Sequence, residues 1–295
     1  MTGIIPLKKE ENMTSFLAVK RVRGIVGEKK CGHTGTLDPM ATGVLPVALG
    51  GATRFIELLP THKKAYKATF RLGLVTDTLD IWGEITEKSG KTASFDDVLK
   101  VLPQFRGKIK QVPPMYSALK KDGVRLYELA RQGVEVEREE RECEIFKLEV
   151  TKLAENEFSL YTECSSGTYI RSLIYDIGEV LGTGAVMTSL NRSFACGISE
   201  DECITLQELE NYRDNNELEK VIIPVDKILS EYPKINVTKP QGVRFKNGGE
   251  LFKQRIKGDV PLGLVRVYCD DEFLGLGESL ENSENLNVKR VYVER

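Results

Sequence analysis

The residues with the clearest chemical potential lie in one short segment of the chain, residues 32–46, with the sequence Gly-His-Thr-Gly-Thr-Leu-Asp-Pro-Met-Ala-Thr-Gly-Val-Leu-Pro. Its glycines let the backbone approach a ligand closely, and the proline after Asp38 restricts the backbone there. A loop that leads into a strand is a common place for a catalytic carboxylate, which makes Asp38 a candidate nucleophile or general base. Taken alone, these residues are explained more simply by an Asx-turn at Asp38 without any chemistry.

The elements that must position this loop are predicted on both sides of it. On the N-terminal side, Thr14 or Ser15 caps a helix that extends to about Val26. The apolar residues of this helix recur at helical spacing and are Phe16, Val19, Val22 and Val26. On the C-terminal side, the apolar run Val44–Leu49 predicts a strand, and residues 52–59 predict a short helix that ends before Pro60.

Further along the chain, strands and helices interleave. From Lys64 the residues Tyr66, Ala68, Phe70 and Leu72 alternate with polar ones, which predicts a half-buried strand. Other strands are predicted near 144–153 and 157–164, and helices at 94–105 (capped by Ser94), from about Tyr169, and at 205–212. The helix from Tyr169 has an apolar stripe formed by Ile170, Leu173, Ile174, Ile177 and Leu181. Because no phosphate-loop glycine pattern accompanies these elements, the sequence favours a mixed α+β fold over a doubly wound parallel one.

The pattern of apolar and polar residues changes near residues 230–235, where we place a domain boundary. After Pro233, short β-type runs at 264–269, 273–276 and 288–293 are separated by polar stretches. We therefore expect a larger domain over residues 1–232 and a smaller β-rich domain over residues 233–295.

Charge is sorted along the chain in a way that the net charge of −2 conceals. Residues 1–133 carry 22 Lys and Arg against 13 Asp and Glu, whereas residues 134–231 carry 9 against 22. A basic half of this kind favours contact with a polyanion such as nucleic acid. Chance drift of the local composition explains the same counts.

Composition limits the other function classes. No apolar run approaches the ~20 residues that span a bilayer, and Lys8 and Lys9 interrupt the N-terminus before a signal-peptide core could form. The six cysteines form no Cys-x-x-Cys pair, which is typical of free thiols in a reducing, cytoplasmic compartment. With His33 and His62 as the two histidines, the chain offers few ligands for a metal site.

The segment 32–46 resembles the signature motif of the bacterial tRNA pseudouridine-55 synthases, the TruB family of pseudouridine synthases. Further family motifs follow in the family's order and cover roughly residues 1–230. They are Lys64-Ala65-Tyr66-Lys67, Thr76-Asp77-Thr78-Leu79-Asp80 with Gly83, Gln111–Lys120, Ser165–Leu173 and Leu190-Asn191-Arg192. The chain departs from the family at residues 9–12, which read Lys-Glu-Glu-Asn where the family usually has Lys-Pro-x-Gly. Asn12 can take the left-handed backbone that glycine would supply, but the rigidity of the proline is lost.

This resemblance implies a fold and an activity. The fold is a mixed, largely antiparallel sheet with flanking helices, followed by a small β-barrel-like (PUA-like) domain that includes Gly242–Gly249. The implied activity is that of an isomerase, which flips the T-loop uridine at position 55 out of tRNA and converts it to pseudouridine. Such an isomerisation needs neither a metal nor a cofactor.

The resemblance also implies roles for individual residues. Asp38 becomes the catalytic carboxylate, Arg171 the group that orients it, and Tyr66 the ring that lies against the flipped uracil. The residues implied to bind substrate are His33, Thr36, Lys20, Lys64, Tyr169 and Leu190. An insertion at about 107–133, with Tyr116 and Tyr127 among basic residues, is implied to grip the T-arm. The C-terminal domain is implied to hold the acceptor stem, and the protein to act as a cytoplasmic monomer without guide RNA or membrane.

Plainer interpretations stay open for single residues and for the whole chain. Arg171 could form a surface salt bridge, Tyr66 could be a core aromatic, and His33 could be a hydrogen-bonding loop residue. A non-catalytic tRNA-binding or folding factor on the same scaffold is one competing function, and the guide-RNA-dependent branch of the superfamily is another. A third is a hydrolase that pairs Asp38 with Asp77 or Asp80. The combination of Asp38, Tyr66 and Arg171 argues against the first, the insertion against the second, and the basic half against the third.

Overall fold

The computed structural model describes residues 1–60 and 62–293, and the larger part of the fold is built around one mixed sheet. Its strands are β1 (Gly3–Lys9), β2 (Cys31–His33), β3 (Thr42–Leu49), β4 (Lys63–Leu72), β7 (Gly107–Gln111), β10 (Arg141–Lys152), β11 (Glu157–Ser165), β12 (Ala185–Ala195) and β13 (Ile198–Ser199). They run in the order β1-β3-β12-β4-β11-β10-β7, with β2 beside β3 and β13 beside β12. The pairing of β3 with β12 is parallel and the other pairings are antiparallel, which confirms the expected mixed sheet.

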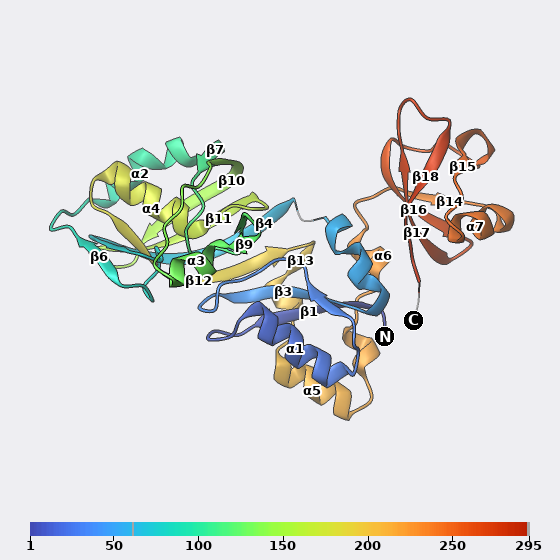
Figure 1. Ribbon diagram of the computed structural model, residues 1–295, viewed down its shortest axis with the longest axis horizontal. Helices are drawn as coiled ribbons and strands as arrows, with labels where there is room; N and C mark the ends of the chain where they lie inside the picture. Colours follow the sequence, from blue (N-terminus) through green and yellow to red (C-terminus); the bar gives the residue numbers. More distant parts are fainter. Residues whose placement is uncertain (61, 294–295) are drawn as a thin grey trace.

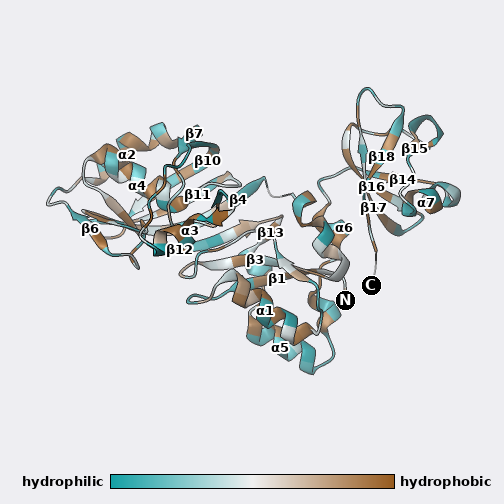
Figure 2. Cartoon of the chain, viewed as in Figure 1, coloured by the Kyte–Doolittle hydropathy of each residue, from teal (hydrophilic) through white to brown (hydrophobic). Residues whose placement is uncertain are grey.

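Helices cover one face of this sheet in two groups, and one short helix packs against the opposite face of β1 and β3 (Figure 1). The helices of the two groups are α1 (Ser15–Val26), α2 (Phe95–Val101), α4 (Ile170–Leu181) and α5 (Leu206–Asp214). The short helix on the opposite face is α6 (Val225–Ile228). Helix α1 packs beside α5, and α2 packs beside α4, at different ends of the sheet. Along α1 and α5, hydrophobic and hydrophilic residues stand side by side, as amphipathic helices require (Figure 2).

Strand β4 shows why the two groups of helices lie on one face. Tyr66, Ala68, Phe70 and Leu72 are buried in the core formed with α1 and α4, as the alternating pattern predicted. The side chains between them, such as Lys67, point to the opposite, solvated face. A half-buried antiparallel sheet accepts this arrangement because one face packs and the other is hydrated.

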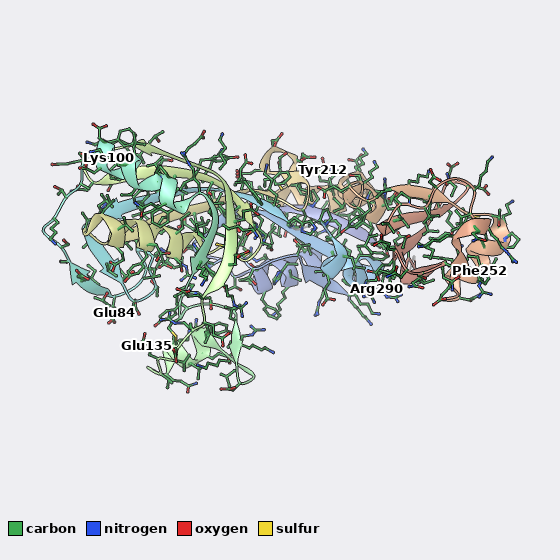
Figure 3. The ribbon with its side chains drawn as sticks, turned by 90° about the horizontal axis from the view of Figure 1, so that it is seen from above. Glu84, Lys100, Glu135, Tyr212, Phe252 and Arg290 are labelled. Carbon is green, nitrogen blue, oxygen red and sulfur yellow. The ribbon has the colours of Figure 1, made fainter. Side chains whose placement is uncertain are left out.

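Smaller elements lie outside the main sheet. They are β5 (Leu74–Thr76), β6 (Ile85–Lys88), β8 (Lys120–Lys121), β9 (Val124–Arg125), α3 (Leu126–Arg131) and the 3₁₀ helices η1 (Gly50–Leu58), η2 (Leu102–Phe105), η3 (Glu200–Glu202), η4 (Leu218–Val221) and η5 (Lys253–Arg255). The structure shifts the start of the predicted insertion, because residues 107–111 form the edge strand β7. The part that leaves the sheet therefore begins after Gln111, and around Glu135 it projects from the side of the body (Figure 3).

The C-terminal part forms a second, curled sheet with its own core. Its elements are β14 (Lys234–Asn236), α7 (Lys239–Lys246), β15 (Leu251–Phe252), β16 (Gly263–Cys269), β17 (Glu272–Ser279) and β18 (Asn285–Val291). Its strands run in the order β14-β16-β17-β18-β15. Phe55 of η1 packs against Phe273 and Tyr292, with ring centroids 6.2 Å apart in both pairs, so an aromatic contact joins the two parts.

Several sequence predictions are confirmed, and some are corrected. Helix α1 begins after Thr14, whose side chain accepts from Leu17 N at 3.1 Å. Phe16, however, does not belong to the buried stripe of α1, since 76% of its area is exposed. The inner face of the helix uses Ser15 and Ala18 instead, because small residues let α1 lie close to the loop at residue 37.

The other differences follow from local backbone chemistry. The helix predicted at 94–105 has the Ser94 cap, but it is α-helical only to Val101 and continues as 3₁₀ turns, with Pro103 at the start of η2. Helix α7 was not predicted, although Thr238 and Gln241 form a capping box at its start. Strand β1 was also missed, because Pro6 in its middle argues against a strand except at an edge.

Gly43 provides a stability test of the loop that enters β3. Its φ is +99°, and a Cβ at this position would lie 2.3 Å from Arg192 O on the neighbouring strand. We expect Gly43→Ala to lower the free energy of unfolding by about 3 kcal/mol or more, since it combines backbone strain with a clash against backbone atoms. Urea unfolding curves measure the effect. Gly90→Ala is the matched control, because nothing lies within 4 Å of a Cβ there, and an equal loss in both variants would contradict the prediction.

Candidate active site

Asp38 lies in the loop between β2 and β3 and faces the first turn of α4, where Arg171 contacts it. Arg171 Nε lies 3.0 Å from Asp38 Oδ2 in an ion pair, and Nη2 donates to Asp38 Oδ1 at 3.2 Å. Because the guanidinium contacts both carboxylate oxygens, it restrains both the position and the plane of the carboxylate. The structure thus brings together two residues that are 133 positions apart in the sequence.

The guanidinium of Arg171 is almost completely buried, with 5% of the side chain exposed, and its remaining donors are also used. Nη1 donates to Thr78 O and Nη2 donates to Tyr116 O, each at 2.8 Å. Asp80 Oδ2 lies 3.6 Å from Nη1, and the same carboxylate accepts from Thr78 Oγ1. Asp80 is therefore enclosed on the inner side of the guanidinium, whereas 32% of the Asp38 side chain is exposed.

Two further buried side chains hold the backbone of the Asp38 loop. Ser15 Oγ accepts from Leu37 N at 2.8 Å and donates to Leu37 O at 3.1 Å. Arg192, which is 1% exposed, donates to Gly35 O at 3.1 Å and to Val44 O at 2.8 Å. The loop is thus fixed by its main chain before and after the carboxylate, which limits the positions open to it.

Lys9 holds the turn in which the chain lacks the family's proline. Its buried Nζ donates to Met13 O at 2.6 Å and to Pro39 O at 3.2 Å. Asn12 takes the left-handed backbone with φ of 59°, as predicted. Burial lowers the pKa of Lys9 to about 8. The lysine therefore ties the turn before α1 to the residue that follows Asp38.

A cavity of about 270 Å³ opens in front of Asp38. Residues 36–38, strand β4, the start of α4 and residues 117–119 of the insertion line it. The predicted site residues found in this lining are Thr36, Asp38, Lys64, Tyr66, Tyr169, Arg171 and Leu190. Burial raises the pKa of the Tyr66 hydroxyl, so this group is protonated at neutral pH and acts as a hydrogen-bond donor.

Positive charge exceeds negative charge around the cavity. Within residues 1–60 and 62–293, neither Lys64 nor Arg192 forms an ion pair with a carboxylate. Burial is the main cause that lowers the pKa of Lys64, followed by the nearby charge of Arg192. Two cations without a carboxylate give the cavity a positive potential that an anionic substrate compensates.

Two predicted substrate-binding residues lie outside this lining. His33 is on β2, and its Nδ1 is buried without a hydrogen-bond partner in the described part of the chain. Burial lowers the pKa of His33, and the charge of Arg192 adds to this, so the imidazole is neutral at pH 7. Lys20 is exposed on the outer face of α1.

The insertion places aromatic and basic side chains next to one another. Tyr127 lies between two guanidinium groups, those of Arg125 and Arg131, at 5.8 and 5.5 Å from its ring centroid. Tyr116 OH donates to Asp77 Oδ2 at 3.1 Å, which ties the base of the insertion to the loop that also contacts Arg171. These pairs are the kind of surface on which nucleotides stack and phosphates bind.

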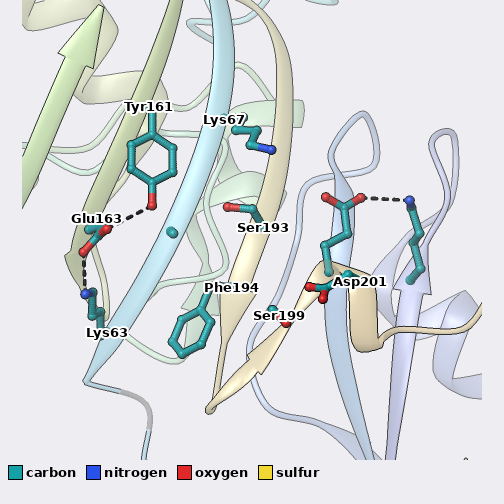
Figure 4. Close-up of a pocket in the computed structure, with 11 residues that line it drawn as sticks. Lys63, Lys67, Tyr161, Glu163, Ser193, Phe194, Ser199 and Asp201 are labelled. Carbon is teal, nitrogen blue, oxygen red and sulfur yellow. Dashed lines mark hydrogen bonds and ion pairs between the residues drawn. The ribbon is translucent and has the colours of Figure 1, made fainter.

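A larger cavity of about 650 Å³ lies on the opposite face of β4 and carries none of these groups. Its charges are largely paired with one another, Lys63 with Glu163 and Lys8 with Glu200, and Tyr161 OH donates to Glu163 at 3.0 Å (Figure 4). An open site with satisfied ion pairs has little left to bind a substrate or activate a bond. The smaller cavity is therefore the better candidate for chemistry.

Sequence reasoning missed the supports of this site. Lys9 and Arg192 stand in family motifs, but the sequence predicts no role for either residue at the site. Gln111 was also missed, although its side chain accepts from Tyr169 N at 3.0 Å and donates to Tyr169 O at 3.2 Å, which fixes the start of α4. Only the motif resemblance offered a signal for these residues, because their partners are backbone atoms far away in the chain.

Three further observations concern membrane spans, metal ligands and thiols. No helix within 1–60 and 62–293 has the length and apolar character to cross a membrane. In the same ranges, no cluster of three or more His, Cys, Asp and Glu side chains is arranged to hold a metal ion. The thiols of the six cysteines are free.

Comparison with known proteins covers nearly the whole chain. Residues 23–170 match the model of the TruB family pseudouridylate synthase N-terminal domain. Residues 171–230 match a tRNA pseudouridylate synthase B C-terminal domain, and residues 233–292 match the C-terminal model of pseudouridine synthase II TruB.

Individual relatives agree with these models. The chain is 45% identical over 299 residues to tRNA pseudouridine synthase B of Clostridium perfringens, with 100% of both chains covered. It is 39% identical over 303 residues to the protein of the same name from Salmonella choleraesuis, covering 99% of this chain and 95% of that one. A solved structure described as a Cbf5-Nop10-Gar1 complex has a TM-score of 0.78 and 28% identity, covering 99% of this chain and 85% of that chain. On its sequence matches, its fold and the residues around Asp38, this chain belongs to the TruB family of pseudouridylate synthases.

Proposed function

We propose that this protein converts the T-loop uridine at position 55 of tRNA to pseudouridine, with Asp38 as the catalytic carboxylate. The observation that carries the proposal is the Asp38 carboxylate, held by both Nε and Nη2 of Arg171 at the mouth of a cavity that also contains Tyr66. The names of the relatives add the substrate class, since they are tRNA pseudouridine synthases.

The reaction is an isomerisation, and its atoms balance without a co-reactant. The N1–C1′ bond of the uridine breaks, the uracil turns, and a C5–C1′ bond forms. The proton on C5 leaves, and N1 gains a proton. A carboxylate serves this sequence as a nucleophile or as a base, and Asp38 is the carboxylate that faces the cavity with a fixed plane.

The other lining residues bind and orient the base in this proposal. The Tyr66 ring and Leu190 form apolar surfaces on β4 and β12 that can enclose a flipped uracil. Because its hydroxyl is protonated, Tyr66 donates a hydrogen bond more readily than it removes the C5 proton. Extrusion of the base from its stack costs a few kcal/mol, and contacts of this kind must offset that cost.

The proposed function also implies which parts of the protein hold the tRNA and where the protein acts. The insertion would grip the T-arm with Tyr127 and its neighbouring arginines, and residues 233–295 would form a separate RNA-binding domain that holds the acceptor stem. His33 would contact RNA where the base leaves the loop. We propose that the protein acts as a cytoplasmic monomer without guide RNA, because its insertion lets a single chain hold the substrate.

A second candidate function is that of a tRNA-binding or folding factor without catalysis. The exposed basic residues favour it as much as they favour the enzyme, but they do not account for the Asp38–Arg171 pair. Incubating purified protein with an unmodified tRNA and mapping the product position decides between the two. Pseudouridine at position 55 supports the enzyme, whereas tight binding without any product supports the folding factor.

Asp38 and Arg171 can be tested together. Asp38→Asn is nearly isosteric but removes the charge, so we expect no product while tRNA affinity stays within a few-fold of wild type. Arg171→Lys keeps the charge and loses the planar pair of bonds, so kcat should fall by a factor on the order of 10² or more with little change in KM. The double variant should be no worse than Asp38→Asn alone, since the residues act as a unit.

Steady-state kinetics and melting curves measured on the same variants separate a catalytic effect from unfolding. Arg171 also donates to Thr78 O and Tyr116 O, so a fall in Tm is expected for Arg171→Lys. A kcat of the wild-type size in that folded variant would remove Arg171 from the catalytic group, and a raised KM alone would make it a phosphate ligand.

Turnover should need no metal or cofactor, because the isomerisation is run by side chains. A T-loop hairpin is the suitable substrate, since it depends less on ions for its fold than whole tRNA does. We expect full activity after dialysis against a chelator. Loss of activity that only added zinc restores would be the contrary result.

The insertion should contribute phosphate contacts. Replacing Lys120, Lys121, Arg125 and Arg131 with Gln should weaken tRNA binding and lower the slope of log Kd against log salt by about 0.7 to 0.9 per lost contact. Kd measured over a series of salt concentrations tests this. Lys67→Gln on the solvated face of β4 is the control, and an unchanged slope in the insertion variant would place the RNA elsewhere.

A further inference from the structure

Helix α1 carries an exposed aromatic residue directly beside the candidate active site. Phe16 is 76% exposed, the highest value among the large hydrophobic side chains of the described residues, and its neighbour Leu17 is 38% exposed. Exposed apolar groups that cluster on a surface mark contact sites. The position is well defined, because Ser15 next to it makes two hydrogen bonds with Leu37, the residue before Asp38.

The outer face of α1 combines this ring with positive charge. Phe16, Lys20 and Arg23 stand at i, i+4 and i+7 and therefore share one face of the helix. Helix α1 contains no acidic residue. In the described part of the chain, no ion pair links Lys20 or Arg23 to an acid of α5, the helix that packs beside α1. A solvated charged face would account for the lysine and the arginine, but it would not account for an exposed phenylalanine among them.

Gly24 adds an independent observation on the same face. It follows Phe16 by eight residues and Lys20 by four, within the helix, and a Cβ at this position would meet nothing within 4 Å. Glycine inside a helix is destabilising relative to alanine. Because no neighbour in the protein requires a glycine here, the open space above it suits the close approach of another molecule.

We infer that the outer face of α1, formed by Phe16, Lys20, Arg23 and Gly24, binds the substrate RNA, with the Phe16 ring packed on a nucleotide close to the flipped uridine. RNA is the occupant that matches this face, because the face has two cations, no anion and a flat apolar group on which a base can stack. Phe16 directly follows Ser15, whose side chain contacts Leu37, the residue before Asp38. We therefore assign its nucleotide to the neighbourhood of the target base, within a T-loop hairpin. This inference rests on the proposed function and extends the RNA contact from the insertion to helix α1.

The decisive experiment compares binding of a fluorescein-labelled T-arm hairpin by the full chain and its variants. Phe16→Ser should weaken binding about five-fold or more, the lower range for loss of a base–aromatic contact, and Phe16→Tyr should restore it. The salt slope should not change in Phe16→Ser but should fall by about 0.7 to 0.9 in Lys20→Gln. Leu99→Ser is the matched control, since Leu99 is 41% exposed on α2, whose first turn carries Asp96 and Asp97.

Gly24→Gln separates stability from binding. A longer side chain should raise Tm, because a helix glycine is replaced by a good helix former, while binding of the hairpin should weaken. Tighter or unchanged binding in this variant, or equal affinities for Phe16→Ser and Leu99→Ser, would overturn the inference. A change in sedimentation of Phe16→Ser without any change in RNA affinity would also overturn it and would assign the face to a second copy of the chain.

A failure of this inference can be distinguished from a failure of the proposed function. The wild-type protein is first assayed for pseudouridine formation in the same hairpin. Absence of product there would contradict the proposed function, whereas product formation together with an unaffected Phe16→Ser variant would contradict this inference alone.

Discussion

The structure depends most on satisfying one buried cation, the guanidinium of Arg171. Leaving a buried charge unpaired costs several kcal/mol, so its donors must find acceptors as the chain folds. Those acceptors come from three separate segments, namely Asp38, the loop with Thr78, and the base of the insertion at Tyr116. Because a guanidinium is planar, the segments meet in a fixed geometry. The orientation of the Asp38 carboxylate is therefore a consequence of the same contacts that close the core around α4.

The excess of positive charge near the cavity follows from a similar constraint. Arg192 is buried on carbonyl oxygens and Lys64 lies close to it without a carboxylate, so neither charge is neutralised within the described protein. Carbonyl dipoles stabilise such a guanidinium but leave its net charge in place. A polyanion that enters the cavity neutralises these two positive charges, whereas a small neutral substrate does not. The chemistry of the lining thus favours RNA over a free nucleoside as the substrate.

Local patterns predicted most elements but few of the contacts between them. Strand β4, helix α4 with its apolar stripe and the Ser94 cap of α2 are confirmed, because periodicity and capping act over a few residues. The pairing of Asp38 with Arg171 spans 133 positions, and no periodicity encodes it. Family resemblance alone pointed to it. Gln111 and Lys9 bind backbone atoms of distant loops, and such contacts appear only once the strands are placed.

The residues that break local rules gather around the Asp38 loop. Lys9 is a fully buried lysine, Asn12 has a left-handed backbone, and Phe16 is an exposed aromatic, all between the end of β1 and the first turn of α1. Each costs stability on its own, and violations of this kind are expected where function requires them. For Lys9 and Asn12 the compensation is visible, because they hold the turn and the loop that present the carboxylate. Phe16 packs on nothing that buries it within the protein, and the proposed contact with RNA would supply the compensation from outside.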